Sequence, residues 1–210
     1  MATTAGPGFV YDKVARDYAK ALRHQLDAKP FDRDLLGRFC AELPAGARVA
    51  DLGCGPGHVT SYLASLGVDV TGLDISRGMV EEAGRRFPDV SFEVGDLMRL
   101  EHADDTWQAA LAMFALIHVA PDDLGAAFDE MRRVLVPGGH LLIACHRGCG
   151  DLRAEHWLGQ DVSLHCYLYE PAGLSEPLEA AGFAIREQHV RPPYPAEHPS
   201  DRVYVWAVAS

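Results

Sequence analysis

The stretch VADLGCGPGHV, residues 49–59, decides the fold of this chain. A short apolar run ends at Leu52, three glycines follow at Gly53, Gly55 and Gly57, and a helix-like segment begins at once. Glycine lets a ligand approach the backbone closely, and the first turn of a helix offers amide groups without an internal partner. A strand, a glycine turn and a helix in this order are typical of the nucleotide-binding end of an α/β sheet. The turn therefore predicts a nucleotide-like ligand.

On both sides of this turn, short apolar runs alternate with amphipathic segments. The runs are predicted strands at residues 48–52, 68–73, 90–94, 107–114 and 140–145. The segments between them are predicted helices at residues 58–66, 76–86 and 121–135, with Ser76 as the N-cap of the second. Two helices precede the first strand, and a helix at 171–181, then strands at 184–190 and 202–209, end the chain. We therefore predict an α/β fold, a three-layer, Rossmann-like, doubly wound and mostly parallel sheet preceded by N-terminal helices.

Composition narrows the class of protein. A chain of 210 residues with 23% charged and 48% hydrophobic residues fits one globular domain. The net charge of -11 argues against nucleic acid as a partner, because phosphate binding normally needs a basic face. The start MATTAGPGF does not resemble a secretory signal, and the apolar stretch 109–117 is shorter than the ~20 residues of a membrane span. Five cysteines without a disulfide-like spacing favour free thiols, so we expect a cytoplasmic protein.

Two carboxylates follow neighbouring predicted strands. Asp74 ends the second strand, at the distance from the glycine turn where a carboxylate accepts hydrogen bonds from both ribose hydroxyls. Asp96, after Gly95, ends the third strand and could accept a hydrogen bond from an adenine amino group, although capping a turn is the alternative role. Because consecutive strand ends of a parallel sheet line one crevice, both carboxylates should face the same ligand.

With these motifs in order, the sequence resembles the class I S-adenosylmethionine (SAM)-dependent methyltransferases, in particular small bacterial members that act on small molecules. The resemblance runs from about Tyr11 to the C-terminus. The matching segments are DLGCGPG at 51–57, GLDIS at 72–76 with Met79, GDL at 95–97, FALIH at 114–118 and LVPGG at 135–139. The family fold also implies that the last strand inserts antiparallel between its neighbours.

The resemblance implies a cofactor, SAM, and the residues that bind it. Asp51 and the glycines would face its amino-acid part, Asp74 the ribose, Asp96 with Leu97 the adenine, and Ile75 with Met79 would add apolar contact. The full predicted cofactor set is Asp51, Gly53, Cys54, Gly55, Gly57, Asp74, Ile75, Met79, Gly95, Asp96, Leu97 and Phe114.

The methyl group of a sulfonium is already an electrophile, so the protein mainly has to orient a nucleophile toward it. A general base is needed where the acceptor is protonated, and His118 is the candidate because it follows the fourth strand; packing beside the cofactor is its alternative role. Candidate acceptor-binding residues are Tyr11, Tyr18, His146 and Tyr167. Tyr11 and Tyr18 also fit the apolar stripe of a helix. No metal is expected, since the cysteines and histidines of residues 145–166 lack a zinc-site spacing.

The leading hypothesis is therefore a methyltransferase acting on O, N, S or C of a small-molecule acceptor. Residues 1–45 would form a helical lid, 46–146 the cofactor-binding core, and 147–210 the acceptor side with the C-terminal hairpin. We expect neither nucleic acid nor membrane as a partner, and a homodimer stays open. The alternatives are a SAM-binding protein that acts through a partner without methyl transfer and an NAD-dependent oxidoreductase, which shares the glycine turn.

Overall fold

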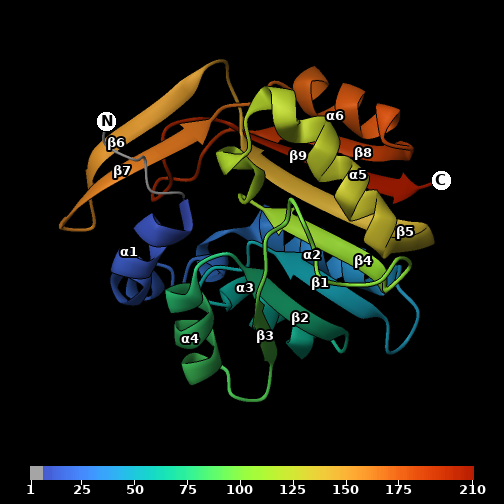
Figure 1. Cartoon of the computed structure of the whole chain (residues 1–210), viewed down its shortest axis with the longest axis horizontal. Helices are drawn as coiled ribbons and strands as arrows, with labels where there is room; N and C mark the ends of the chain where they lie inside the picture. Colours follow the sequence, from blue (N-terminus) through green and yellow to red (C-terminus); the bar gives the residue numbers. More distant parts are fainter. Residues whose placement is uncertain (1–6) are drawn as a thin grey trace.

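The computed structural model describes residues 7–210 as one α/β unit built on a seven-stranded sheet (Figure 1). The prediction that the N-terminus is no secretory signal falls mostly on residues outside this range. No helix within 7–210 is long and apolar enough to cross a membrane.

The sheet has the order β3-β2-β1-β4-β5-β9-β8. Its strands are β1 (Arg48–Leu52), β2 (Asp69–Asp74), β3 (Ser91–Val94), β4 (Trp107–Met113), β5 (Leu135–His146), β8 (Phe183–Arg191) and β9 (Arg202–Ala209). The first five run parallel to one another, and β9 pairs antiparallel with both β5 and β8. This confirms the predicted mostly parallel sheet and the insertion of the last strand between its neighbours.

Two separate cores cover the two faces of the sheet, which explains why most strands are apolar on both sides. On one face α5 (Leu124–Val134) and α6 (Pro171–Ala180) bury a cluster around Phe128 and Leu178. On the other face α2 (Pro30–Ala41) and α3 (His58–Ser65) bury a cluster around Phe39 and Trp206. Remaining helical elements are α1 (Pro7–Ala21), α4 (Arg77–Arg86), and the short turns η1 (Leu26–Ala28), η2 (Leu116–His118) and η3 (Pro121–Asp123).

The chain changes direction across the sheet between β1 and β4, because β2 and β3 lie on one side of β1 while β4 and β5 lie on the other. Such a switch point opens a crevice at the carboxyl ends of the strands. The glycine turn after β1, Asp74 at the end of β2 and the segment after β4 all lie at that end.

A second sheet, which the sequence did not predict, covers this end of the molecule. It is the hairpin of β6 (Asp151–Trp157) and β7 (Gln160–Tyr167), turned by Leu158 and Gly159, both with positive φ as a two-residue hairpin turn requires. The hairpin lies beside α1, and the two share a small apolar cluster of their own, formed around Val10, Val14 and Val162 (Figure 1). Together α1 and the hairpin cover the carboxyl ends of the strands, and we call these two elements the roof.

Candidate cofactor and acceptor site

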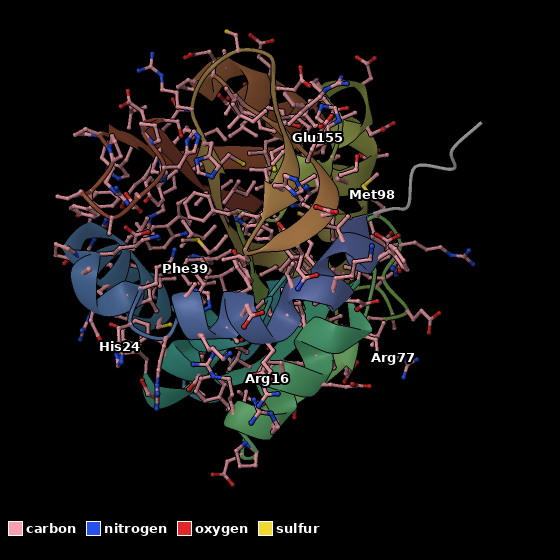
Figure 2. The ribbon with its side chains drawn as sticks, turned by 90° about the vertical axis from the view of Figure 1, so that its left-hand side faces the viewer. Arg16, His24, Phe39, Arg77, Met98 and Glu155 are labelled. Atoms are coloured by element: carbon pink, nitrogen blue, oxygen red, sulfur yellow. The ribbon has the colours of Figure 1, made fainter. Side chains whose placement is uncertain are left out.

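Beneath this roof is a cavity of about 810 Å³. Figure 2 shows α1 lying across the molecule, with the hairpin that carries Glu155 on one side of it and α4 with Arg77 on the other. The cavity joins all three predicted elements of the cofactor site with most of the predicted acceptor residues. The predicted residues that line it are Tyr11, Tyr18, Asp51, Gly53, Cys54, Gly55, Asp74, Ile75, Gly95, Asp96, Leu97, Phe114, His118 and His146.

The glycine turn has backbone conformations that residues with a side chain rarely adopt. Gly53, Gly55 and Gly57 all have positive φ, of 72°, 54° and 80°. A Cβ at Gly55 would point toward the Tyr18 ring, 3.9 Å away, so the backbone here faces the cavity. Gly57 does not line the cavity: a Cβ there would meet the Phe92 ring at 2.7 Å. Gly57 instead allows the start of α3 to pack closely on the Phe92 ring of β3. The glycine motif alone does not predict this packing role.

Asp74 is the best-defined polar group of the site. One carboxylate oxygen accepts the Gly55 amide at 2.8 Å and the other accepts the Ser76 amide, also at 2.8 Å. Burial raises the pKa of Asp74, and the two amide hydrogen bonds oppose that rise. A carboxylate oxygen accepts more than one hydrogen bond, so each keeps capacity for a further donor from the cavity.

Asp51 lies deeper, 1% exposed, and accepts the Thr60 hydroxyl at 2.7 Å. Burial raises its pKa to about 6, and the neighbouring Asp74 adds to the effect. Two buried carboxylates at one end of the cavity therefore favour a ligand that carries positive charge.

The adenine side differs in part from the prediction. Asp96 lines the cavity, but one of its oxygens accepts the Met98 amide at 2.9 Å, so it does cap the turn after β3. Met79 is 1% exposed within α4 and does not line the cavity, because its position on the first turn of that helix directs it into the core. Ile75 is 46% exposed and lies at the rim.

On the acceptor side, aromatic rings from the two roof elements gather. Tyr18 lies 5.0 Å from Trp157 between ring centroids, and Tyr11 lies 5.7 Å from the same Trp157 and 5.3 Å from His118. Trp157, next to the hairpin turn, is not among the predicted acceptor residues, because no local sequence pattern marks a residue of such a turn as facing a cavity. The predicted base His118 sits in η2 and touches both α1 and β7.

Tyr167 is the one predicted acceptor residue that the structure places elsewhere. Along β7 the side chains alternate, so that Leu164 and Cys166 line the cavity whereas His165 and Tyr167 stack on the opposite face, 4.5 Å apart between ring centroids. Tyr167 therefore lies on the strand that borders the cavity, but on its other face. The alternation of apolar and polar residues along a strand does not show which face of a two-stranded sheet is covered.

A buried charge cluster forms the far wall of the cavity. Lys29 binds Glu197 at 2.9 Å, and Arg191 binds both Glu197 at 2.7 Å and Asp32 at 2.8 Å. Arg202 closes the cluster, only 2% exposed. The sequence did not predict this cluster, because its members come from distant parts of the chain. The Glu197 side chain, in the proline-rich loop 191–201, is only 5% exposed.

His146 lines the same wall, and its Nδ1 lies 2.9 Å from the Ser200 hydroxyl. Burial and the nearby Arg202 lower its pKa to about 3, so its ring is neutral at physiological pH. Phe114, whose φ of 62° is unusual for a non-glycine residue, packs on His146 with ring centroids 5.2 Å apart. Its strained backbone turns the chain from β4 toward η2 at the cavity.

The residues that line the cavity fit SAM. The backbone at Gly55 is open toward the cavity, the Asp74 carboxylate is buried yet keeps acceptor capacity, and two carboxylates suit a cationic ligand. An open glycine turn, a buried carboxylate after the next strand and a crevice at the switch point are typical of a Rossmann-like nucleotide-binding fold.

Comparisons with known proteins show similarity over part of the chain. Residues 49–139 match a family model described as "Methyltransferase domain". A demethylmenaquinone methyltransferase of Beutenbergia cavernae is 46% identical over 99 residues, which are 47% of this chain and 40% of that protein. The chain therefore spans about two fifths of the length of such relatives.

Solved structures agree in fold over nearly the whole chain. A Burkholderia thailandensis 1,6-didemethyltoxoflavin-N1-methyltransferase, solved with its substrate and S-adenosylhomocysteine, has a TM-score of 0.68 at 21% identity and covers 100% of this chain and 93% of its own. The 4+2 cyclase SpnF has a TM-score of 0.76 at 21% identity, covering 99% and 97%. Together these matches show a methyltransferase-like Rossmann fold over nearly the whole chain and a segment, residues 49–139, that is similar to methyltransferase domains.

Proposed function

We propose that this protein transfers the methyl group of SAM to a small-molecule acceptor held in the same cavity. The observation that supports this most is that one cavity contains both groups of residues. The glycine turn and Asp74 line one part of it, and the Tyr11, Tyr18 and His118 rings line another. Small molecules are the named substrates of relatives such as the trans-aconitate 2-methyltransferase of Methylobacterium nodulans, 40% identical over 114 residues.

In this proposal, Asp74 holds the ribose hydroxyls, Asp51 and the glycine turn face the amino-acid part, and Asp96 with Leu97 frames the adenine. SAM, when bound, supplies an electrophilic methyl group. The protein orients the acceptor's nucleophile against it, because proximity and alignment can supply most of the acceleration. His118 takes up the acceptor's proton where there is one.

The roof of the cavity would exclude water from the reacting atoms and hold the acceptor. In this proposal α1 and the hairpin of β6 and β7 form the cover, the segment from β1 to β5 holds the cofactor, and Lys29, Glu197 and Arg202 line the charged wall. The volume of about 810 Å³ must hold both molecules, which favours a small acceptor. The net charge of -11 favours acceptors other than nucleic acid.

Two measurements test the proposal. Calorimetry with SAM, S-adenosylhomocysteine and NAD should show binding of the first two and none of NAD; tight NAD binding without SAM binding would make the protein an oxidoreductase. Mass spectrometry should then detect a methylated product from a panel of catechol, 2-mercaptoethanol, benzoate and trans-aconitate incubated with SAM.

A SAM-binding protein without methyl transfer is the second candidate. The similarity in fold to the 4+2 cyclase SpnF supports this second candidate, because it shows that the same fold can carry an activity other than methyl transfer. Binding of SAM with no methylated product from any acceptor class would decide for it.

A further inference from the structure

The hydrogen bonds of His118 fix which ring nitrogen carries the hydrogen. Its Nδ1 lies 2.9 Å from the backbone carbonyl oxygen of His165. A carbonyl oxygen accepts and never donates, so Nδ1 must be the protonated nitrogen of the neutral ring. The Cys166 sulfur is 4.0 Å from the same Nδ1 and is the weaker partner. Nε2 is therefore the basic nitrogen of His118.

That basic nitrogen is already occupied by another residue. The Tyr11 hydroxyl lies 2.8 Å from Nε2, and it must be the donor because Nε2 has no hydrogen. A hydroxyl that donates its hydrogen still presents two oxygen lone pairs. Since Tyr11 and His118 both line the cavity, a proton from the acceptor reaches His118 most directly through the Tyr11 oxygen.

We propose that Tyr11 and His118 form a two-residue proton relay, in which the Tyr11 oxygen receives the proton of the acceptor while the Tyr11 hydrogen passes to Nε2 of His118. This inference rests on the proposed methyl transfer and deepens it. It names the acceptor class: a nucleophile that carries a removable hydrogen, such as a hydroxyl or a thiol, and not a carboxylate.

The step balances in atoms and charge. The bond from the acceptor oxygen or sulfur to the methyl carbon forms as the bond from that carbon to the sulfonium sulfur breaks, and the electron pair of the broken bond stays on sulfur. The acceptor proton moves to Tyr11, the Tyr11 proton moves to His118, and the positive charge of the sulfonium ends on the imidazolium. The His165 carbonyl, already bonded to Nδ1–H, stabilises that charge, and the proton later leaves to water.

The groups around the pair are in forms that suit this role at neutral pH. Tyr18 of α1, Cys166 and His165 of β7, and Asp74 of β2 face the pair. Burial raises the pKa of Tyr18 to about 12 and that of the Cys166 thiol to about 11, so both stay neutral. Burial lowers the pKa of His118, which leaves its Nε2 free of a proton above that pKa.

A purely structural role makes a different prediction. The same two hydrogen bonds tie α1 and β7 to η2, so the pair could simply hold the roof in place. Tyr11→Phe removes the hydroxyl and keeps the ring that packs on Trp157 and Tyr18. Tyr62→Phe is the matched control, because it removes a tyrosine hydroxyl in α3 that bonds the Arg33 carbonyl at 3.5 Å, outside the cavity.

The test combines a direct readout of the ring with kinetics. Nitrogen-15 NMR of the ligand-free protein should show His118 with hydrogen on Nδ1 and a hydrogen-bonded, unprotonated Nε2, and Tyr11→Phe should shift the Nε2 signal. With catechol or 2-mercaptoethanol as acceptor, Tyr11→Phe should lower kcat by about 10-fold to 1000-fold while leaving the Kd for SAM within about twofold. Tyr62→Phe should match the wild type, and wild-type kcat should rise with pH through the lowered pKa of His118.

Three results overturn the relay: hydrogen on Nε2 of His118, wild-type kcat retained in Tyr11→Phe, or a wild type that methylates benzoate or trans-aconitate but neither hydroxyl nor thiol. In each of these cases methyl transfer itself survives. A wild type that binds SAM and methylates none of the four probes instead overturns the proposed function, so the two failures are distinct.

Discussion

Burial mainly sets the protonation states of the titratable residues around the cavity. Desolvation disfavours the charged form of a group, and it moves the pKa of Asp51 upward to about 6 and that of His58 downward to about 4. Burial lowers the pKa of His58, His118 and His146, so these three rings are neutral at pH 7. The Lys29 ammonium, which also lines the cavity, is held in an ion pair with Glu197. The chemistry of the site depends on these protonation states as much as on which residues are present.

Asp74→Asn should weaken SAM binding about 10-fold or more, since a neutral amide is a poorer acceptor and one of two buried hydroxyls loses its partner, at ~1–3 kcal/mol. Asp69→Asn, at the opposite end of β2, is the control and should bind as the wild type does. Calorimetry with SAM measures both. Equal affinity for SAM in the two variants would remove Asp74 from the cofactor site.

Because burial keeps the His58 ring neutral, we expect the protein to lose stability in mild acid. Its Nε2 lies 3.1 Å from the Gln25 side-chain oxygen, and burial lowers its pKa from 6.5 to about 4. Because the unfolded chain binds this proton first, the stability tied to neutral His58 is complete above pH 6.5 and is lost as pH falls toward 4. Relative to His58→Gln, the wild type should lose about 1–2 kcal/mol between pH 7 and pH 5 in urea unfolding. A difference between the two proteins that stays constant with pH would contradict this.

At the scale of elements, the unit from β1 through the glycine turn to α3 combines two demands. Gly55 serves the cavity, whereas Gly57, also with positive φ, serves the contact of α3 with β3 through Phe92. One motif therefore contains a ligand-facing glycine and a packing glycine, and they respond to substitution in different ways.

Gly57→Ala should lower the free energy of unfolding by roughly 2–4 kcal/mol, because it adds both left-handed strain and a clash with Phe92. Gly46→Ala is the matched control: Gly46 has a φ of 72° but no heavy atom within 4 Å of its added Cβ, so it should cost strain alone, about 1 kcal/mol. Urea unfolding of the two variants gives the packing contribution as their difference. Equal losses would mean that the Phe92 ring moves aside freely.

At the scale of the whole molecule, the buried charge cluster joins distant parts of the chain. Lys29 and Asp32 come from α2 and its start, Arg191 ends β8, and Glu197 comes from the loop before β9. Lys29, Asp32, Glu197 and Arg202 of this cluster line the cavity, so stability and the shape of the cavity are coupled there.

Glu197→Ala should destabilise the protein by about 3–5 kcal/mol, since it leaves Lys29 and Arg191 as buried charges with one partner fewer. Glu42→Ala, which breaks an exposed pair with Arg186 at 2.8 Å, should destabilise the protein far less, because solvent screens exposed ion pairs. The same cations hold the pKa of Glu197 well below its usual value. Its contribution is therefore complete at neutral pH and should fade as pH falls below about 4. Thermal unfolding of both variants at pH 7 measures the contrast, and similar losses would show that the cluster contributes little.

Much of the fold was predictable because its signals are local. The central strands β1 and β4 are short apolar runs, and Ser76 caps α4 as expected, with its hydroxyl accepting the Met79 amide at 3.1 Å. One helix boundary shifted: the predicted helix at 121–135 begins as the 3₁₀ turn η3, and Leu135 already belongs to β5. Such shifts are small because hydrophobic periodicity marks the middle of an element better than its ends.

By itself, the amino-acid sequence determined the doubly wound sheet, the glycine turn and the order of the two carboxylates, since all of these follow from residues adjacent in the chain. Only the tertiary structure decided that Cys166 and not Tyr167 faces the cavity, that Glu197 is buried, and that Tyr11 bonds to His118 across 107 positions. The physical reason is that burial, face and hydrogen-bond partner are properties of the folded surroundings of a side chain, and elements remote in sequence supply those surroundings.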